Sequence, residues 1–228
     1  MVWLKKKAIG DNPADLFASS VSEGFDYLAI GNSITVHGVS DFWWAEYGMA
    51  ASRPENDYVH QVADGISEED INTGVYNYSI WETQAHDRTE TYELLDKWLE
   101  PEIDLITVQL SENCSDTTTF TSDFKALITH VFRMCPDACV VVIDDFWNEE
   151  RHEMKKAVCS ELGVAFVDLS DIAGMAEWQA GIGTEAWGVD GATHIIEHQG
   201  VAIHPGDNAM ELIADRTLEL FRSFQKRK

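Results

Sequence analysis

The sequence predicts an α/β fold of the three-layer α/β/α kind, built on a parallel sheet of five strands. Two observations lead to this fold class. Five short apolar runs alternate along the chain with longer segments of mixed or helical pattern. These runs are nearly continuous in Val, Ile and Leu, which is typical of strands covered by helices on both faces of a sheet. The predicted strands are residues 27–30, 75–80, 105–110, 139–143 and 164–168.

Helices are predicted between and after these strands. In residues 83–99, the side chains of Tyr92, Leu95 and Leu99 share one face, with acidic residues on the other. Further helices are predicted over about 119–133, 149–162 and 208–225. Residues 1–25 are predicted to be an irregular N-terminal lead-in, and residues 171–206 a long connection. The chain has 228 residues with no repeat or linker, so we expect a single domain over 1–228.

Charge narrows the range of partners. The chain has 16 Lys and Arg against 40 Asp and Glu, a formal net charge of −24. Such a surface repels phosphate backbones and anionic lipid, so we expect neither a nucleic-acid nor a membrane partner, although the acidity also serves solubility. No apolar run reaches the ~20 residues that cross a bilayer, and the basic N-terminus has no apolar stretch behind it. The four cysteines lack paired CxxC spacing and are expected to be free thiols of a cytoplasmic protein.

Polar residues capable of chemistry follow two of the predicted strands, where ligands bind in parallel sheets. Ser33 ends the first strand, at a turn expected to lead into a helix. Asn113 follows the third strand, and His204 precedes the last helix. A serine beside a neutral histidine can act as a nucleophile, and an asparagine amide can stabilise an oxyanion. Taken singly, each has an ordinary alternative: a helix cap, a turn residue and a structural loop histidine.

Taken together and in this order, the segments resemble the SGNH (GDSL-like) hydrolase family. The resemblance lies in YLAIGNSITVHG (27–38), NYSIWE (77–82), DLITVQLSEN (104–113) and HPGDNAMELIA (204–214). It implies a flavodoxin-like sheet and a serine esterase that needs no cofactor and no metal. It also implies that Ser33 is the nucleophile, that His204 is its general base, and that the Ser33 N–H and the Asn113 side chain form the oxyanion hole.

The chain departs from the family pattern in three places. Val201 stands where the family usually has the triad aspartate, so a backbone carbonyl near Val201, or Glu197 or Asp190, would have to orient His204. Asp207 is expected to cap the last helix instead. The second-block glycine falls near Glu82, whose backbone N–H could still donate, while the Trp81 and Glu82 side chains would narrow the pocket. Ser111 replaces a glycine in the third block, with little expected effect.

Several further residues are candidates for the site. His37 lies within reach of Ser33, and Asp144 and Asp145 end a strand, where we expect them to be solvated. His194 and His198 have i, i+4 spacing but lack the glutamate of a zinc motif. Five tryptophans lie in or near connections at one end of the sheet, and one or two of them are expected to line the site. They are Trp43, Trp44, Trp81, Trp147 and Trp187.

The sequence therefore predicts a carboxylic-ester hydrolase that removes a small acyl group, with acetyl favoured, from a carbohydrate or similar ester. Two alternatives stay open. One is a non-catalytic glycan- or ligand-binding module on the same scaffold, which the departures at Val201 and Glu82 suggest. The other is an acyltransferase to a sugar. The natural substrate, its acyl length and the oligomeric state do not follow from the sequence.

Overall fold

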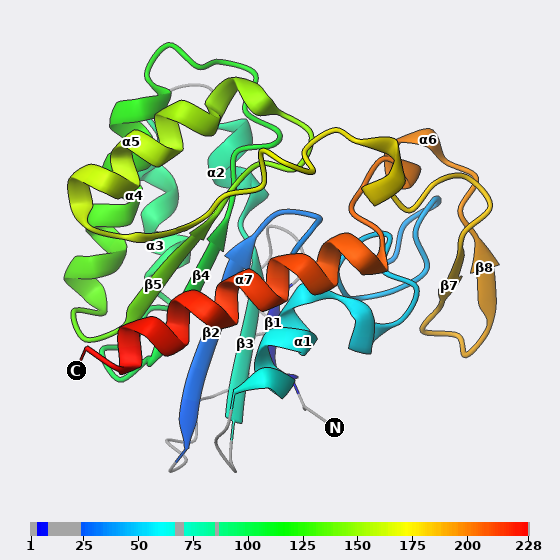
Figure 1. Cartoon of the computed structure of the whole chain (residues 1–228), viewed down its shortest axis with the longest axis horizontal. Coiled ribbons are helices and arrows are strands. Elements are labelled where there is room, and N and C mark those ends of the chain that lie inside the picture. The colour runs from blue at the N-terminus through cyan, green and yellow to red at the C-terminus, as the bar shows by residue number, and fades with distance from the viewer. Residues whose placement is uncertain (1–3, 9–23, 67–70, 85–86, 228) are drawn as a thin grey trace.

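A parallel sheet of six strands forms the middle layer of the molecule, in the order β1-β3-β2-β4-β5-β6 (Figure 1). The computed structural model describes residues 4–8, 24–66, 71–84 and 87–227, with the backbone alone for 4–8. The strands are β1 (Leu4–Ala8), β2 (Phe25–Gly31), β3 (Ile71–Asn77), β4 (Leu105–Gln109), β5 (Cys139–Ile143) and β6 (Ala165–Val167). The five predicted strands are β2 to β6, so the predicted fold class is confirmed.

The additional strand, β1, lies in the segment that we expected to be irregular. It pairs in parallel with β3 at one edge of the sheet. Its sequence, LKKKA, contains three consecutive lysines and therefore lacks the apolar run that marks the inner strands. Charged residues are common on edge strands because they prevent further pairing. Residues 1–3 and 9–23 of the expected lead-in lie outside the described residues.

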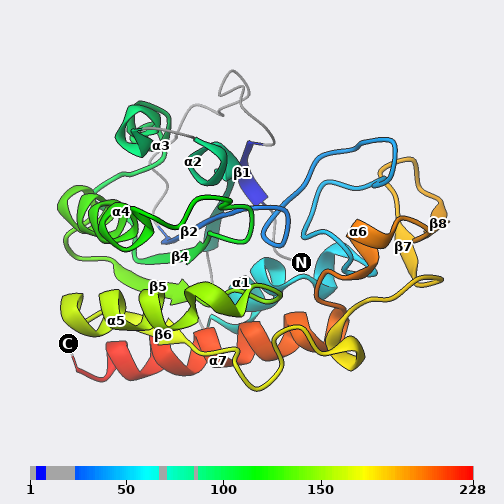
Figure 2. The same ribbon diagram turned by 90° about the horizontal axis from the view of Figure 1, so that it is seen from above.

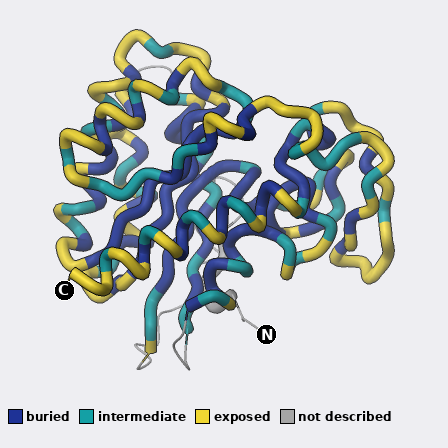
Figure 3. Tube along the Cα trace, viewed as in Figure 1, coloured by how far each residue is buried: buried dark blue, intermediate teal, exposed yellow. Residues whose placement is uncertain are grey.

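Helices cover both faces of the sheet, and β2 shows how the faces divide. Tyr27 and Ala29 pack into the cluster that contains α1 (Tyr58–Gly65) and α7 (Asp207–Gln225). Leu28 and Ile30 pack into the opposite cluster, which contains α4 (Phe120–Met134) and α5 (His152–Leu162). Figure 2 shows α1 and α7 on one side of the sheet and α4 on the other. The central strands β4 and β5 are buried throughout (Figure 3), which explains their continuous apolar sequences.

The predicted continuous helix over 83–99 is absent from the described residues, which form a 3-10 turn (Arg88–Thr91) and α3 (Tyr92–Leu95) there. A short helix, α2 (Ser79–Thr83), precedes them and takes in Ser79 and Ile80, the end of the predicted strand 75–80. The Asp87 side chain caps the 3-10 turn by accepting the Thr89 N–H, and the buried Arg88 side chain donates to the Trp81 carbonyl. Capping and threonine side chains compete with a continuous helix in this segment. The spacing of its apolar residues therefore did not predict the backbone conformation of this segment.

The long connection from 171 to 206 contains structure of its own. Strands β7 (Glu185–Trp187) and β8 (Thr193–Ile195) form an antiparallel hairpin, followed by the short helix α6 (Gln199–Ala202). In Figure 1 this unit is coloured yellow to orange and stands beside the main sheet. All four cysteines are free and buried. Among the described residues, no helix combines the length and hydrophobicity needed to cross a membrane.

Candidate active site

The turn after β2 places Ser33 at the carboxyl end of the sheet. Gly31 ends the strand at a point with no room for a side chain, since a Cβ there would lie 1.9 Å from Thr35 Oγ1 and 2.7 Å from the Gln109 carbonyl oxygen. The Asn32 side-chain oxygen accepts the Ile34 N–H at 3.0 Å. These contacts fold the chain tightly over the end of the strand, and they leave Ser33 partly exposed.

No helix follows Ser33, contrary to our expectation. Residues 32–35 form bends and turns, and the next α-helix, α1, begins at Tyr58. The sequence Ile34-Thr35-Val36 explains this, because three consecutive β-branched residues disfavour a helix. A helix dipole therefore does not act on this site. The Ser33 N–H has no hydrogen-bond partner within the described part of the chain, so it is available as a donor to a ligand.

Ser33 and His204 lie in direct contact although 171 residues separate them. Ser33 Oγ is 2.8 Å from His204 Nε2. His204 Nδ1 is 2.7 Å from the Gly200 carbonyl oxygen. A carbonyl oxygen can only accept, so Nδ1 carries the hydrogen and Nε2 of the neutral ring has a free lone pair. The imidazole is thus in the tautomer that can accept the Ser33 hydroxyl proton.

Burial keeps His204 neutral. Its side chain is 7% exposed, and desolvation lowers its pKa from 6.5 to about 4. The Gly200 carbonyl raises this pKa and the nearby His37 lowers it further, both to a smaller extent. No carboxylate contributes to the shift. His204 is therefore an unprotonated base over the whole neutral and mildly acidic range.

The group that orients His204 is the Gly200 carbonyl, one residue before Val201, in the first turn of α6. Neither of the two carboxylates that we considered for this role contacts His204. Asp190 accepts from His194 Nε2, and Glu197 is exposed. Asp207 does not cap α7, contrary to our expectation: it is the first residue of the helix, and its side chain accepts from the Ser52 N–H and hydroxyl, which fastens α7 to the loop before α1. A carbonyl partner has no side-chain signature, so the sequence indicated its neighbourhood but not its identity.

Asn113 is exposed at the end of β4, and its side-chain amide bonds Glu82 instead of standing free. Asn113 Nδ2 donates to Glu82 Oε2 at 2.6 Å. The other carboxylate oxygen of Glu82, Oε1, accepts the Asn32 amide at 3.0 Å and the Ser111 N–H at 2.5 Å. Glu82 is 2% exposed, and burial raises its pKa, while hydrogen bonds from the side chains of Asn113 and Asn32 and from the backbone of Ser111 and Asn113 lower it. The second hydrogen of Asn113 Nδ2 remains for a ligand.

Ser111 has a larger role than we expected. Its φ is +120°, a backbone conformation that favours glycine. Its backbone N–H is held by Glu82, and its hydroxyl donates to Asp145 Oδ1 at 2.5 Å. These two bonds maintain the strained backbone next to Asn113. The serine thus replaces glycine here because its side chain supplies a compensating hydrogen bond.

Asp144 and Asp145 are buried, each about 1% exposed, which corrects the expectation of a solvated strand end. Asp145 forms ion pairs with Arg151 at 3.0 Å and Lys155 at 2.8 Å. Asp144 accepts from His152 Nδ1 at 2.6 Å. The missed signal was the spacing of Arg151 and Lys155, i and i+4, on the α5 face that continues with the buried Val158.

Of the five tryptophans considered above, some lie in the core and one lies beside the candidate site. Trp81, which we expected to narrow the pocket, is fully buried and packs against Phe120 and Phe124 in the core. Its side chain therefore does not line the crevice. Trp43 is also fully buried. Trp147 is partly exposed, and its ring centroid lies 4.7 Å from that of His204.

Trp147 packs on His204, and His37, which interacts electrostatically with His204, adjoins a second pair of rings. In this pair, Phe42 stacks on His198 with ring centroids 4.7 Å apart and lies 6.2 Å from His37. Phe42 is 37% exposed, and His198 directly precedes α6, which carries Gly200. This set, Trp147, His37, Phe42 and His198, is called the aromatic rim below. It offers flat apolar faces close to the Ser33–His204 pair.

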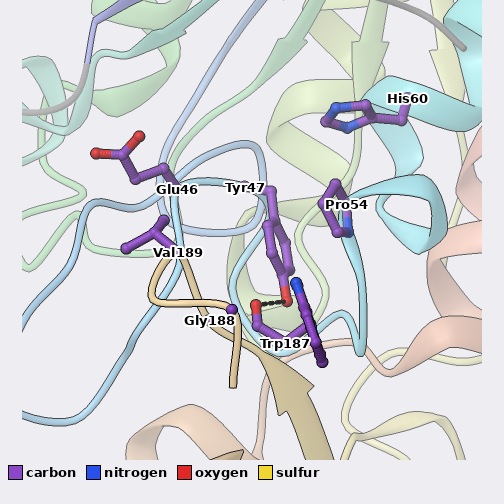
Figure 4. A pocket seen from close by; sticks show the side chains of 8 residues that line it. Glu46, Tyr47, Pro54, His60, Trp187, Gly188 and Val189 are labelled. Carbon is purple, nitrogen blue, oxygen red and sulfur yellow. Dashed lines mark hydrogen bonds between the residues drawn. The ribbon is translucent and has the colours of Figure 1, made fainter. Parts of the chain in front are cut away.

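A separate cavity of about 350 Å³ lies between the loop before α1 and the β7–β8 hairpin (Figure 4). Tyr47 crosses it and donates its hydroxyl to the Trp187 carbonyl at 2.8 Å. Arg53 lies over the Trp187 ring, 5.3 Å from its centroid. Neither Ser33 nor His204 lines this cavity. This cavity is therefore separate from the Ser33–His204 pair.

Comparison with known proteins finds similar solved structures but no matching family model or curated sequence. Among solved structures, the chain is similar to a two-domain esterase active on acetylated mannans, with a TM-score of 0.54 and 15% identity over 90% of this chain. The chain spans about half of that esterase, 50% of its length.

Two further structures share the fold. An extracellular lipase from Streptomyces rimosus has a TM-score of 0.53 and 12% identity, over 87% of this chain and 99% of the lipase. A carbohydrate esterase family 2 enzyme from Corynascus thermopiles has a TM-score of 0.54 and 9% identity, over 93% of this chain and 70% of that one. At 9–15% identity these likenesses concern the fold, an α/β sheet flanked by helices. The chain has the SGNH hydrolase fold.

Proposed function

We propose that this protein is a serine-dependent carboxylic-ester hydrolase that removes a small acyl group, with acetyl favoured, from a carbohydrate ester. The observation that carries the proposal is the contact of 2.8 Å between Ser33 Oγ and His204 Nε2, with Nδ1 bound to the Gly200 carbonyl. A neutral, correctly protonated histidine beside a partly exposed serine is the arrangement that nucleophilic acyl transfer needs. It forms a dyad in which a backbone carbonyl replaces the usual carboxylate.

The chemistry follows from this geometry. Ser33 Oγ attacks the ester carbonyl carbon while His204 Nε2 takes the hydroxyl proton. The oxyanion accepts from the Ser33 N–H and from the free hydrogen of Asn113 Nδ2. The tetrahedral intermediate breaks to release the alcohol, which leaves with the proton from His204. Water then attacks the acyl-serine, again giving its proton to His204, and the carboxylic acid and free Ser33 result.

Three observations support a small acyl group on a carbohydrate. The aromatic rim beside His204 presents flat apolar faces of the kind that pack on sugar rings. The net charge of −24 favours neutral substrates over phosphorylated or anionic ones. The similar structures include an esterase active on acetylated mannans and a family 2 carbohydrate esterase.

A fluorophosphonate probe provides the direct test. It phosphonylates only a serine that is activated as a nucleophile, so wild-type protein is expected to be labelled at Ser33 and to hydrolyse p-nitrophenyl acetate. Peptide mapping by mass spectrometry identifies the labelled residue. Ser33→Ala is the negative control for labelling and for turnover. Rates on p-nitrophenyl butyrate and octanoate show which acyl chain length the protein prefers. Absence of both labelling and turnover in folded wild-type protein would contradict the proposal.

One observation favours a second candidate, a glycan-binding module without catalysis. Glu82 occupies the position of the second-block glycine, and its buried carboxylate already engages Asn113. If the oxyanion lacks this donor, the aromatic rim could still bind a sugar. Isothermal titration with acetylated and deacetylated oligosaccharides separates the two candidates, because a binding module binds without changing the ligand.

The pH profile is expected to extend unusually far into the acid range. His204 must be neutral to act, and burial lowers its pKa to about 4. The rate constant kcat/KM should therefore stay flat through pH 6.5, where an ordinary histidine is half protonated, and fall only as the pH approaches about 4. Initial rates between pH 3.5 and 8, corrected for spontaneous hydrolysis and accompanied by circular dichroism, check this. A midpoint near pH 6.5 would show that His204 is not desolvated.

A further inference from the structure

Glu82 joins the two segments that carry the candidate catalytic groups. It lies on α2, after β3. Its Oε1 accepts from the Asn32 side chain, next to Ser33, and from the Ser111 N–H. Its Oε2 accepts from Asn113. One buried carboxylate thus connects the turn after β2 with the loop after β4.

The hydrogen-bond pattern requires the ionised carboxylate. All three partners are N–H donors, and both oxygens are used. A protonated carboxyl would direct its own hydrogen against one of these donors. The same three bonds offset the desolvation of the charge and spread it over several N–H groups, which limits its repulsion of a neighbouring oxyanion. Glu112 and Cys114, on the loop after β4, are the titratable groups that also interact with Glu82.

We propose that Glu82 is a positioning residue that fixes the Asn113 carboxamide, binding one hydrogen of Nδ2 so that the other is directed at the oxyanion. The proposal rests on the proposed esterase function. It explains how the site tolerates a glutamate where a glycine is usual in the resemblance. Without the carboxylate, the exposed Asn113 side chain has no partner among the described residues that fixes its rotamer.

Glu82→Gln tests this role with nearly unchanged volume. Glutamine has one acceptor and one donor at its end, so its NH₂ must face either Asn113 or the Asn32 and Ser111 donors. If the glutamine NH₂ faces Asn113, the Asn113 carboxamide rotates so that its oxygen accepts from that NH₂. The rotation moves the Asn113 NH₂ group away from the oxyanion. We expect kcat for p-nitrophenyl acetate to fall by about 10- to 100-fold with KM within about twofold, somewhat less than for loss of the donor itself. Glu82→Asp keeps an acceptor-only carboxylate and should lose less.

A double-mutant cycle separates positioning from a merely structural role. Asn113→Ala removes the donor and should lower kcat by about 10²–10³-fold. If Glu82 acts through Asn113, Glu82→Gln should cause no further loss in the Asn113→Ala background. Multiplicative losses would overturn the proposal. Glu90→Gln is the matched control, because Glu90 accepts one exposed hydrogen bond from Gln84 and should leave kcat unchanged.

A second measurement does not depend on turnover. In ¹H–¹⁵N spectra, the side-chain amide of Asn113 and the backbone amide of Ser111 should resonate at low field in wild-type protein and shift upfield in Glu82→Gln. Unchanged resonances in a folded variant would refute the positioning role whether or not the protein hydrolyses esters. Wild-type protein without esterase activity but with these shifts would contradict the proposed function alone and support the contact.

Discussion

Replacing Ser33 with alanine is expected to lower kcat for p-nitrophenyl acetate by about 10⁴-fold or more, and His204→Ala is expected to do the same. The reason is that the two side chains act as one unit through their contact of 2.8 Å. Without Nε2 to take the proton, the hydroxyl is a weak nucleophile, and without the hydroxyl the base has no nucleophile to activate. The double variant should therefore be no slower than either single variant. Stopped assays at equal concentrations of folded protein, checked by circular dichroism, measure these rates.

Two controls keep this result specific. Ser122→Ala changes an exposed serine on α4, and His194→Ala changes a histidine that pairs with Asp190 and stacks on Trp44. Both should retain wild-type kcat. Retention of more than about a tenth of the wild-type kcat by folded Ser33→Ala would mean that another group is the nucleophile. Equal rates for wild type and both site variants would favour the binding module.

Asp145→Asn is expected to cause the largest loss of stability, about 3 kcal/mol in the free energy of unfolding. Asp145 is the counter-charge of two buried cations, Arg151 and Lys155, which are 1% and 0% exposed. Asparagine preserves the shape but leaves both cations unpaired and turns an NH₂ group toward one of them. Burial and the Asp145 charge raise the pKa of Glu112, and Lys155 lowers it, so removal of the Asp145 charge favours ionisation of Glu112 beside Lys155. This new counter-charge offsets part of the loss, and the value lies at the lower end for a broken buried pair.

Thermal unfolding measures this loss. For a chain of this size, about 3 kcal/mol corresponds to a decrease in Tm of roughly 6–12 °C. Asp171→Asn provides the control, since it breaks an exposed pair with Arg216 at 2.7 Å and should cost under about 1 kcal/mol. Equal stability of Asp145→Asn and wild type would show that Arg151 and Lys155 are not buried as described. Because Asp145 also holds the Ser111 hydroxyl, any residual folded protein should have a lower kcat.

How far the sequence predicts this structure depends on whether a feature is local or results from packing. The inner strands were predictable because burial on both faces leaves continuous apolar runs, as in Cys139–Ile143. The contact between Ser33 and His204 was predictable because both residues belong to segments of a known pattern, whereas their catalytic roles stay a prediction. The lysine-rich β1 was not, since an edge strand carries no such run.

Other features depend on contacts between distant segments. The charged side chains of Asp145 and Lys155 suggest exposure, and only their pairing explains their burial. Trp81 was placed near the pocket by its neighbour Glu82, but on one turn of α2 these two side chains point to different surroundings. Sequence order alone does not distinguish those surroundings.

The partner of His204 is a peptide carbonyl, which every amino acid possesses. Mutational scanning would consequently detect the serine and the base but pass over the third member of the site. The contact depends on the backbone path of α6 and not on an acidic side chain, so the orientation of the imidazole does not require an aspartate at position 201. Replacement of the Gly200–Val201 amide by an ester bond, introduced through semisynthesis, would weaken this carbonyl as an acceptor. The resulting change in kcat would measure how much the carbonyl contributes to the rate.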